Sequence, residues 1–432
     1  MNYNKIFDEL FPICRSITGK GYRDSVKILS KFINFKIYKF KSGSKVYDWK
    51  VPMEWSIKDA FILGKNNKRI VDFKKNNLHV VNYSCAVNKT VTKKNLFKKI
   101  YSIKKNPNLI PYVTSYYKKN WGFCIKHKDL KKFKESSYSV KINSSFSIGN
   151  VEYGLKILKG TSKKIILLSS YLCHPSMANN EISGPLVLLG LYEKIKKMKN
   201  RKYTYYFLIN PETIGSICFI NKNEKILKKN LLAGLVLTCL GGPRKKLSYK
   251  MSRKGNSRFD KIFNYLTKFD NGFEVRNFDP TEGSDERQYC SGKLNFPVGQ
   301  IARTVYGQYK EYHTSGDDKK FMKISNIQKS VNKIFKVIKL NENLKEITRV
   351  NPECELQLGK RNLYPNLASF KTRKQSSDKK MDNRNQLKVI QNILSYADGK
   401  HFLIDISTNL NIKLKYIKKI NEILIKRKLI KI

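Results

Sequence analysis

The 432-residue chain is 41% hydrophobic and carries a formal net charge of +54. This composition supports a substantial core and excludes wholesale disorder, and at roughly 100–200 residues per domain the length predicts two or three domains. Taken alone, the charge favours a polyanionic partner such as nucleic acid, an acidic membrane surface or an anionic glycan. The basic excess is mostly Lys spread along the whole chain, beside many Asn, Ile, Tyr and Phe, the residues of A/T-rich codons. We therefore interpret most of it as a solvated exterior.

The first segment, MNYNKIFDELFPICRSITGKG, contains acidic residues and no continuous apolar stretch, so it does not have the pattern of a signal peptide. No run reaches the ~18 apolar residues of a membrane span. The eight cysteines are scattered without a Cys-x-x-Cys pair, which favours a reducing compartment and argues against a disulfide scaffold or a zinc finger. We expect a cytoplasmic protein with no membrane span.

The first part of the chain changes its periodicity once. Residues 5–34 have apolar positions at three- and four-residue spacing, which predicts helix with a break at Gly19–Gly21. From about residue 35 to 83 the pattern becomes short β-like runs, which indicate a small β-rich unit.

From about residue 137, buried strands alternate with helices. Strands are expected at 137–146, paired with 151–160, and at 164–171, 203–210, 233–242 and 296–304. Helices are expected at 184–198, 214–223, 258–269 and 325–340. This alternation predicts a largely parallel α/β sheet, in which the chemistry lies at the carboxyl ends of the strands.

The C-terminal part reads as a separate unit. Residues 371–386 are polar and charged and are predicted to be a linker. Three short helices and a β tail are expected after it, which is a winged-helix outline. The last helix carries six basic residues from Lys415 to Lys428. Lys contacts to phosphate carry no sequence specificity, so we do not expect nucleic acid as a partner and favour a protein-contact or self-association module.

Three residues stand at predicted strand ends and carry metal or acid–base chemistry. His174 follows the apolar strand that ends in YLC, Glu212 follows the next strand, and His313 precedes the last long helix of the α/β region. Imidazole and carboxylate are zinc ligands, and a carboxylate at such a place can take a proton from water and return it to a leaving amine. Each residue alone has an ordinary explanation: a loop hydrogen bond for either His, and a helix N-terminal acid for Glu212.

Four segments occur together in one order: YLCHPSMANNEISG, NPETIGS, GSDERQY and EYHTSGDD. In this order and strand context they resemble the co-catalytic zinc aminopeptidases and the glutamate-carboxypeptidase-like enzymes. Over nearly its whole length the chain is similar to a bacterial family of aminopeptidase-like proteins. That match rests on segments such as CRSITG, VYDWKVPMEW, LIPYVTSYYKKNWGFC, GSDERQYCS and EYHTS.

The resemblance implies a fold and a domain order. The fold class is α/β, a zinc aminopeptidase-type mixed and mostly parallel sheet flanked by helices, with an inserted β-rich domain and a C-terminal winged helix. The expected domains are a core formed by residues 1–40 and 135–350, an insert at 41–134 and a winged helix at 380–432. Members of the family occur among genes for surface polysaccharide synthesis.

The resemblance also implies a ligand set, with departures. The aminopeptidase pattern has two adjacent Glu, where this chain has only Glu212, and a bridging Asp, where this chain has Asn180 followed by Glu181. The third strand ends in Thr238–Cys239 instead of an Asp ligand. We therefore expect one zinc ion (Zn2+) held by His174, Glu181 and His313.

The catalytic residues are expected to be Glu212 and Asp285. Glu212 would polarise the water; alternatively it is a ligand, and Glu181 or Asp285 is the base. Arg287, in GSDERQY, is either a clamp for a substrate carboxylate or phosphate, or part of a surface ion pair.

The leading prediction is a zinc-dependent hydrolase that cleaves an amide bond in a small peptide-like substrate or an aminoacylated or acylated sugar. The runner-up is a non-catalytic sugar- or peptide-binding protein that uses the winged helix as an interaction or homo-oligomer module. A third reading, a DNA-binding regulator with a metabolite-sensing core, requires salt-sensitive and sequence-dependent DNA binding.

Overall fold

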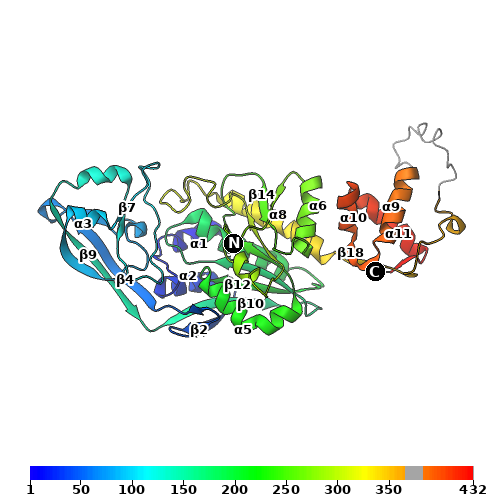
Figure 1. Ribbon diagram of the computed structural model, residues 1–432, viewed down its shortest axis with the longest axis horizontal. Helices are drawn as coiled ribbons and strands as arrows, with labels where there is room; N and C mark the ends of the chain where they lie inside the picture. Colours follow the sequence, from blue (N-terminus) through cyan, green and yellow to red (C-terminus); the bar gives the residue numbers. More distant parts are fainter. Residues whose placement is uncertain (365–382, 432) are drawn as a thin grey trace. The chain divides into compact units, whose positions relative to one another are not determined.

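The computed structural model describes residues 1–364 and 383–431 (Figure 1). The chain forms two compact units, one of Met1–Phe259 with Glu274–Lys336 and one of Asp260–Phe273 with Val337–Ile432. Each unit is described by itself. In the described residues, no helix is both long enough and apolar enough to cross a membrane.

The first unit contains a mixed eight-stranded sheet in the spatial order β1–β10–β12–β11–β13–β16–β14–β15. In that order the strands are Lys36–Lys41, Asn150–Leu158, Thr204–Asn210, Ile165–Tyr171, Leu231–Leu237, Val298–Ala302, Leu247–Lys250 and Phe273–Arg276. The four central strands β12, β11, β13 and β16 are parallel, and β1, β10 and β14 are antiparallel to their neighbours. The predicted fold class, an aminopeptidase-type mixed sheet flanked by helices, is confirmed.

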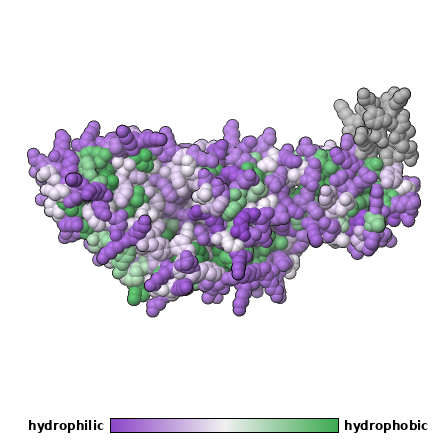
Figure 2. Space-filling view, viewed as in Figure 1, coloured by the Kyte–Doolittle hydropathy of each residue, from purple (hydrophilic) through white to green (hydrophobic). Residues whose placement is uncertain are grey.

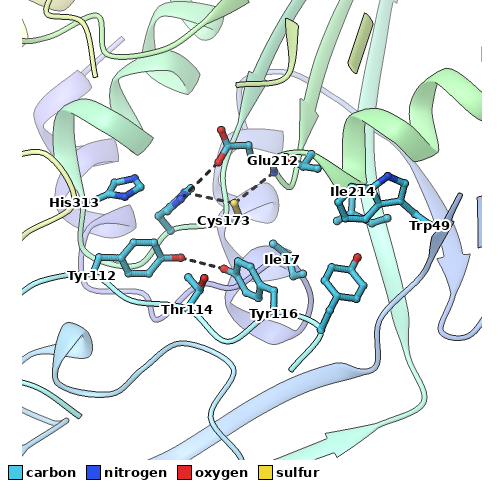
Figure 3. A pocket seen from close by; sticks show the side chains of 12 residues that line it. Ile17, Trp49, Tyr112, Thr114, Tyr116, Cys173, Glu212, Ile214 and His313 are labelled. Atoms are coloured by element: carbon cyan, nitrogen blue, oxygen red, sulfur yellow. Dashed lines mark hydrogen bonds and ion pairs between the residues drawn. The ribbon is translucent and has the colours of Figure 1, made fainter. Parts of the chain in front are cut away.

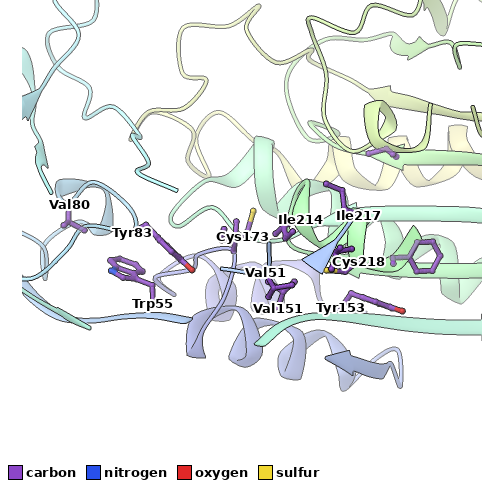
Figure 4. Packing of buried hydrophobic residues seen from close by; sticks show 14 of the residues in the cluster. Val51, Trp55, Val80, Tyr83, Val151, Tyr153, Cys173, Ile214, Ile217 and Cys218 are labelled. Atoms are coloured by element: carbon purple, nitrogen blue, oxygen red, sulfur yellow. The ribbon is translucent and has the colours of Figure 1, made fainter. Parts of the chain in front are cut away.

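Helices surround this sheet. They are α1 (Tyr3–Leu10), α2 (Lys20–Ser30), α4 (Ser183–Lys196), α5 (Ile214–Asn230) and α7 (Glu286–Tyr289). Helix α8 (Ile324–Glu342) begins in the first unit and ends in the second, and nearly all of α6 (Arg258–Phe269) belongs to the second unit. A one-turn π-helix, Ala178–Ile182, leads into α4. All seven residues of β11 are buried, which explains the continuous apolar pattern of that strand. The first unit also contains a large cluster of buried hydrophobic side chains that includes Trp55, Tyr83 and Tyr153. Figure 4 shows how some of these side chains pack.

The predicted break in the first helix is also present. Gly19 has a φ of +91°, which favours glycine, and a Cβ on Gly21 would lie 2.0 Å from the carbonyl oxygen of Cys14. Helix α2 therefore begins at this close turn.

A second, four-stranded sheet of the first unit has the order β5–β4–β9–β6. Its strands are Arg69–Asp72, Glu54–Leu63, Ser137–Ser147 and Val87–Thr92, and the same part of the chain holds β2 (Lys45–Val46), β3 (Trp49–Lys50), β7 (Ile100–Tyr101), β8 (Phe123–Cys124) and α3 (Lys93–Phe97). Short 3-10 helices lie at Lys65–Asn67, Asn77–His79 and His127–Lys132. The predicted pairing of 137–146 with 151–160 is wrong: β9 pairs with β4 and β6, whereas β10 pairs with β1 and β12. Alternation identifies a strand but does not select its partner.

The second unit contains the winged helix. Its elements are β17 (Glu346–Arg349), a 3-10 helix (Gly359–Arg361), α9 (Asn383–Ser395), β18 (Asp398–Phe402), α10 (Leu403–Leu410), α11 (Leu414–Lys426) and β19 (Ile430–Lys431). The strands form a sheet in the order β18–β17–β19. The three predicted helices and the β tail are confirmed. Of the predicted linker, residues 371–382 lie outside the described residues and 383–386 begin α9.

Candidate metal centre and active site

The candidate site lies where the central parallel strands end. Strand β11 runs into Cys173 and His174, β12 into Pro211 and Glu212, and β13 into Thr238 and Cys239. Parallel strands bring their carboxyl ends to the same edge of the sheet, so residues far apart in the sequence meet there.

The ring of His174 is held in one orientation. Its Nδ1 lies 2.6 Å from Oε2 of Glu181, whose Oε1 accepts the backbone N–H groups of His174, at 2.8 Å, and of Cys173. Arg15, in the CRSITG segment, donates from Nε to the His174 carbonyl oxygen at 3.0 Å. Burial lowers the pKa of His174, but the charge and hydrogen bonds of Glu181 and Cys173 together raise it well above its usual value. With Nδ1 bonded to Glu181, Nε2 is the ring nitrogen left for other chemistry.

Glu212 faces that nitrogen. Its Oε2 lies 3.6 Å from His174 Nε2, and its Oε1 accepts a hydrogen bond from Ser284 Oγ at 2.5 Å. Burial raises the pKa of the Glu212 carboxyl, against the lowering effects of His174 and Ser284. A raised pKa suits a group that must both accept and return a proton near neutral pH.

Asp285 lies beneath the turn that carries Glu212. Its carboxylate accepts from the backbone N–H of Thr213 at 2.7 Å, from Asn210 Nδ2 at 2.8 Å and from Ser216 Oγ at 3.1 Å. Burial, and next the charge of Glu212, raise the pKa of Asp285 to about 7. This geometry fits a positioning residue for the Glu212 turn better than the predicted catalytic role.

His313 approaches from a loop of the same unit. Its ring centre is 5.3 Å from that of His174, and the ring stacks on Tyr312 with centres 3.9 Å apart. The backbone at His313 has a φ of +51°, an unusual conformation outside glycine, and its carbonyl oxygen accepts the N–H of Tyr112 at 2.8 Å. Burial, and next the charge of His174, lower the pKa of His313 to about 3, so its imidazole is neutral and has a lone pair to offer.

These distances fit one tetrahedral zinc. With Zn–N bonds of about 2.0–2.1 Å, the centres of two imidazole rings that hold one zinc ion stand roughly 5 Å apart. The ring centres of His174 and His313 are 5.3 Å apart. Glu212 Oε2 lies 3.6 Å from His174 Nε2, beside the place where those two rings would hold an ion. Within the described residues, Cys173, His174 and Glu212 also each offer a ligand atom within 4.8 Å of one another.

A cavity of about 360 Å³ opens beside these groups (Figure 3). One wall consists of Cys173, His174, Glu212 and His313, and the other is aromatic. The aromatic residues are Trp49, Tyr112, Tyr116 and Tyr117. The hydroxyls of Tyr112 and Tyr116 are 3.0 Å apart, and the ring of Tyr112 lies against both histidine rings. The three tyrosines come from the loop between β7 and β8, so this loop forms the wall of the cavity opposite the strand ends.

The structure brings His174, Glu181, Glu212 and His313 together, but in different roles. Glu181 contacts the Nδ1 side of His174, where a carboxylate orients the ring, and not the Nε2 side, where Glu212 lies.

Sequence reasoning missed Cys173, Asp317 and Tyr112. Cys173 adjoins His174 at the strand end, a position that was a usable signal. Asp317 accepts the N–H groups of Asn179 and Asn180 at 2.6 and 2.9 Å and so ties the π-helix to the His313 loop. Nothing in the local pattern around Tyr112 points to a site 62 residues away along the chain.

Comparison with known proteins identifies the family. Residues 4–344 match the family described as domain of unknown function DUF4910, and residues 345–432 match a winged helix-turn-helix family. A Clostridium acetobutylicum protein named "Putative polysaccharide biosynthesis protein with aminopeptidase-like domain" is 40% identical over 431 residues, which cover 100% of this chain and 96% of that protein.

Solved structures with a similar fold include relatives of the same kind. The crystal structure of a "putative peptidase" from C. acetobutylicum superposes with a TM-score of 0.82 at 38% identity, covering 99% of this chain and 95% of that chain. BSAP, a zinc aminopeptidase from Bacillus subtilis, is similar in fold alone, with a TM-score of 0.56 at 12% identity over 78% of this chain and 93% of that chain. The chain therefore belongs to the bacterial aminopeptidase-like family, with a DUF4910 domain followed by a winged helix.

Proposed function

We propose that this protein is a single-zinc hydrolase that cleaves an amide bond in a small substrate of surface-polysaccharide metabolism. The observation that carries the proposal is the His174 ring, fixed through Nδ1 by Glu181 and presenting Nε2 to Glu212, with His313 beside it. The polysaccharide context is supported by the name of the C. acetobutylicum relative.

A single metal accounts for the departures from the two-metal pattern. Where that pattern places acidic ligands for a second ion, this chain has the neutral pair Asn180 and Cys239, with Cys239 Sγ 3.8 Å from Asn180 Oδ1. Burial raises the pKa of the Cys239 thiol to about 12, so it carries no charge at neutral pH. His174 and His313 would hold the one ion, with Glu181 orienting His174.

The chain's own residues supply the proton transfers. A zinc ion provides Lewis-acid activation of water and of the amide carbonyl. Glu212 accepts the proton of the attacking water at Oε2 and delivers it to the leaving amine. Ser284 keeps the other oxygen of Glu212 engaged, and the aromatic wall limits access of bulk water.

We also retain as a proposal the division into a core (1–40 and 135–350), an insert (41–134) and a winged helix (380–432). The separate four-stranded sheet supports the insert, although its strand β9 extends to Ser147.

Elemental mass spectrometry of the purified protein tests the proposal. We expect about one zinc per chain in the wild type, loss of zinc in His174→Ala and His313→Ala, and retention in His127→Ala, whose imidazole bonds to Ser102 outside the site. Glu212→Gln should keep the zinc and reduce turnover of aminoacyl or acylated sugar substrates by roughly 10²–10⁴-fold. Full zinc retention in either His variant would remove that residue from the site. A chain that takes up no zinc on reconstitution would favour the binding-protein alternative.

A further inference from the structure

A second cavity, of about 580 Å³, adjoins the one at the candidate metal centre. The two cavities share Trp49 and Thr213 as lining residues. Its other walls are formed by Phe278, Pro280, Gln288, Cys290, Ser291, Gly292 and two arginines, Arg253 and Arg287. A molecule that reaches past Trp49 from the zinc site therefore enters this space.

The charge of this second cavity has one sign. Among the described residues, its lining includes two guanidinium groups and no carboxylate. Another cavity of similar volume, about 530 Å³, shows what the Lys-rich background alone produces: its three lysines are accompanied by the acids Glu311 and Asp318. A Lys-rich cavity of this chain can therefore include acids in its lining, whereas the second cavity includes none among the described residues.

Both arginines have unused donors. Arg253 donates from Nε to Asn295 Oδ1 at 3.1 Å and from Nη2 to the carbonyl oxygen of Gly292 at 3.0 Å, and Arg287 donates from Nε to the carbonyl oxygen of Ser284 at 3.4 Å. Within residues 1–364 and 383–431, neither guanidinium forms an ion pair with a carboxylate. These bonds hold the side chains in place and leave most of the five N–H donors of each group free.

The two sites are also linked through the chain. Arg287 follows Ser284 and Asp285, and these two residues contact Glu212 and the turn that carries it. Trp49 lines both cavities from the start of β3, and Tyr47, in the turn of the β2–β3 hairpin, donates a hydrogen bond to Glu224 of α5 at 2.5 Å. The ring of Trp49 lies edge-on to Tyr117, with centres 5.6 Å apart, so an aromatic surface borders the passage between the two cavities.

We propose that Arg253 and Arg287 form an anion subsite that binds a phosphate or carboxylate group of the substrate while its amide lies at Glu212. Guanidinium forks match the planar or tetrahedral arrangement of such oxygens, which an ammonium group does not. This assignment rests on the proposed hydrolase for the position of the amide. It names the substrate class as an anionic compound whose charged group and amide are joined by a spacer that packs against Trp49.

Methyl phosphate and acetate are suitable probes because both carry a methyl group for detection. We would measure their dissociation constants by saturation-transfer NMR at 0.15 M NaCl on the zinc-loaded full chain. Arg253→Gln and Arg287→Gln should each weaken binding of the preferred probe about tenfold, since each removes a charge-assisted pair of hydrogen bonds. Arg253→Lys and Arg287→Lys should restore part of the loss, because they keep the charge without the fork.

Lys254→Gln is the matched control, since it removes one exposed positive charge next to Arg253 from a side chain that does not line the cavity. It should change the dissociation constant less than twofold. Equal weakening in Lys254→Gln, or no effect of either arginine, would overturn the subsite in favour of diffuse surface binding. Preference for methyl phosphate assigns the group as phosphate, and preference for acetate assigns it as carboxylate.

His313→Ala separates this inference from the proposed function. If the subsite is real, Arg-dependent binding of the probe persists in that variant even though zinc is lost. If only the subsite is wrong, the arginine variants keep full zinc content and Glu212-dependent turnover.

Discussion

A single buried carboxylate, that of Glu181, determines what His174 presents to the candidate site. One of its oxygens accepts two backbone N–H groups and the other contacts the imidazole Nδ1 at 2.6 Å. The ring is thereby fixed in one tautomer, with Nε2 directed to Glu212. Glu181 thus influences the site by orienting His174.

Glu181→Gln tests that role. The substitution keeps the shape but replaces a charged acceptor by an amide, so we expect zinc affinity to fall about 10–100-fold. The free energy of unfolding should fall by about 1–3 kcal/mol, because a buried hydrogen bond is mispaired. Chelator competition and denaturant unfolding measure the two effects, with the exposed Glu135→Gln as control. Unchanged zinc affinity would contradict the orienting role, and complete loss of zinc at saturating metal would instead make Glu181 a ligand.

At the scale of elements, the turn between β12 and α5 places Glu212. Thr213 in this turn has a φ of +64°, a strained backbone for a β-branched residue. Asp285, immediately before α7, accepts hydrogen bonds from both ends of the turn, at Asn210 and Ser216, and from Thr213 itself. The conformation of this turn is therefore stabilised by Asp285, a residue about 70 positions further along the chain.

Asp285→Asn should loosen this turn. The amide must direct its NH₂ at one of three donors, so we expect the free energy of unfolding to fall by about 1–3 kcal/mol and kcat to fall with zinc content unchanged. The exposed Asp279→Asn, on the same loop, should change stability by less than about 0.5 kcal/mol. A loss of kcat with no loss of stability would point instead to Asp285 as the catalytic base.

At the scale of the whole molecule, the net charge of +54 dominates the surface. Figure 2 shows a face covered mainly by hydrophilic side chains. So many like charges repel one another in the compact state, and salt screens that repulsion over about 10 Å at 0.1 M.

We therefore expect the thermal midpoint of unfolding to rise between 20 and 300 mM NaCl, roughly the range in which the Debye length falls below the spacing of surface charges. Differential scanning calorimetry measures it. A variant in which the exposed Lys58, Lys68, Lys141 and Lys225 are changed to Glu should show a weaker dependence on salt. A midpoint that falls with salt would mean that favourable ion pairs outweigh the net repulsion.

Much of the molecule follows from local patterns. The predicted helix at 258–269 coincides with α6, because its apolar period of 3.6 matches one buried face. His174 and Glu212 were placed at strand ends because continuous apolar runs identify central parallel strands, whose carboxyl ends meet. The strand after residue 137 was found, but its partner was not, because one-sided alternation fits more than one sheet.

By itself the sequence determined the family, the α/β sheet, the winged helix and the positions of His174, Glu212 and His313 in the chain, since these depend on periodicity and on residue order. Only the tertiary structure decided that Glu181 contacts Nδ1 and not Nε2, that Asp285 lies under the Glu212 turn, and that Tyr112 and Trp49 enclose the cavity. The physical reason is that these contacts join segments far apart in the chain through side-chain directions. The direction in which a side chain points depends on the surrounding backbone and on the residues that pack against it. A local sequence pattern encodes neither of them.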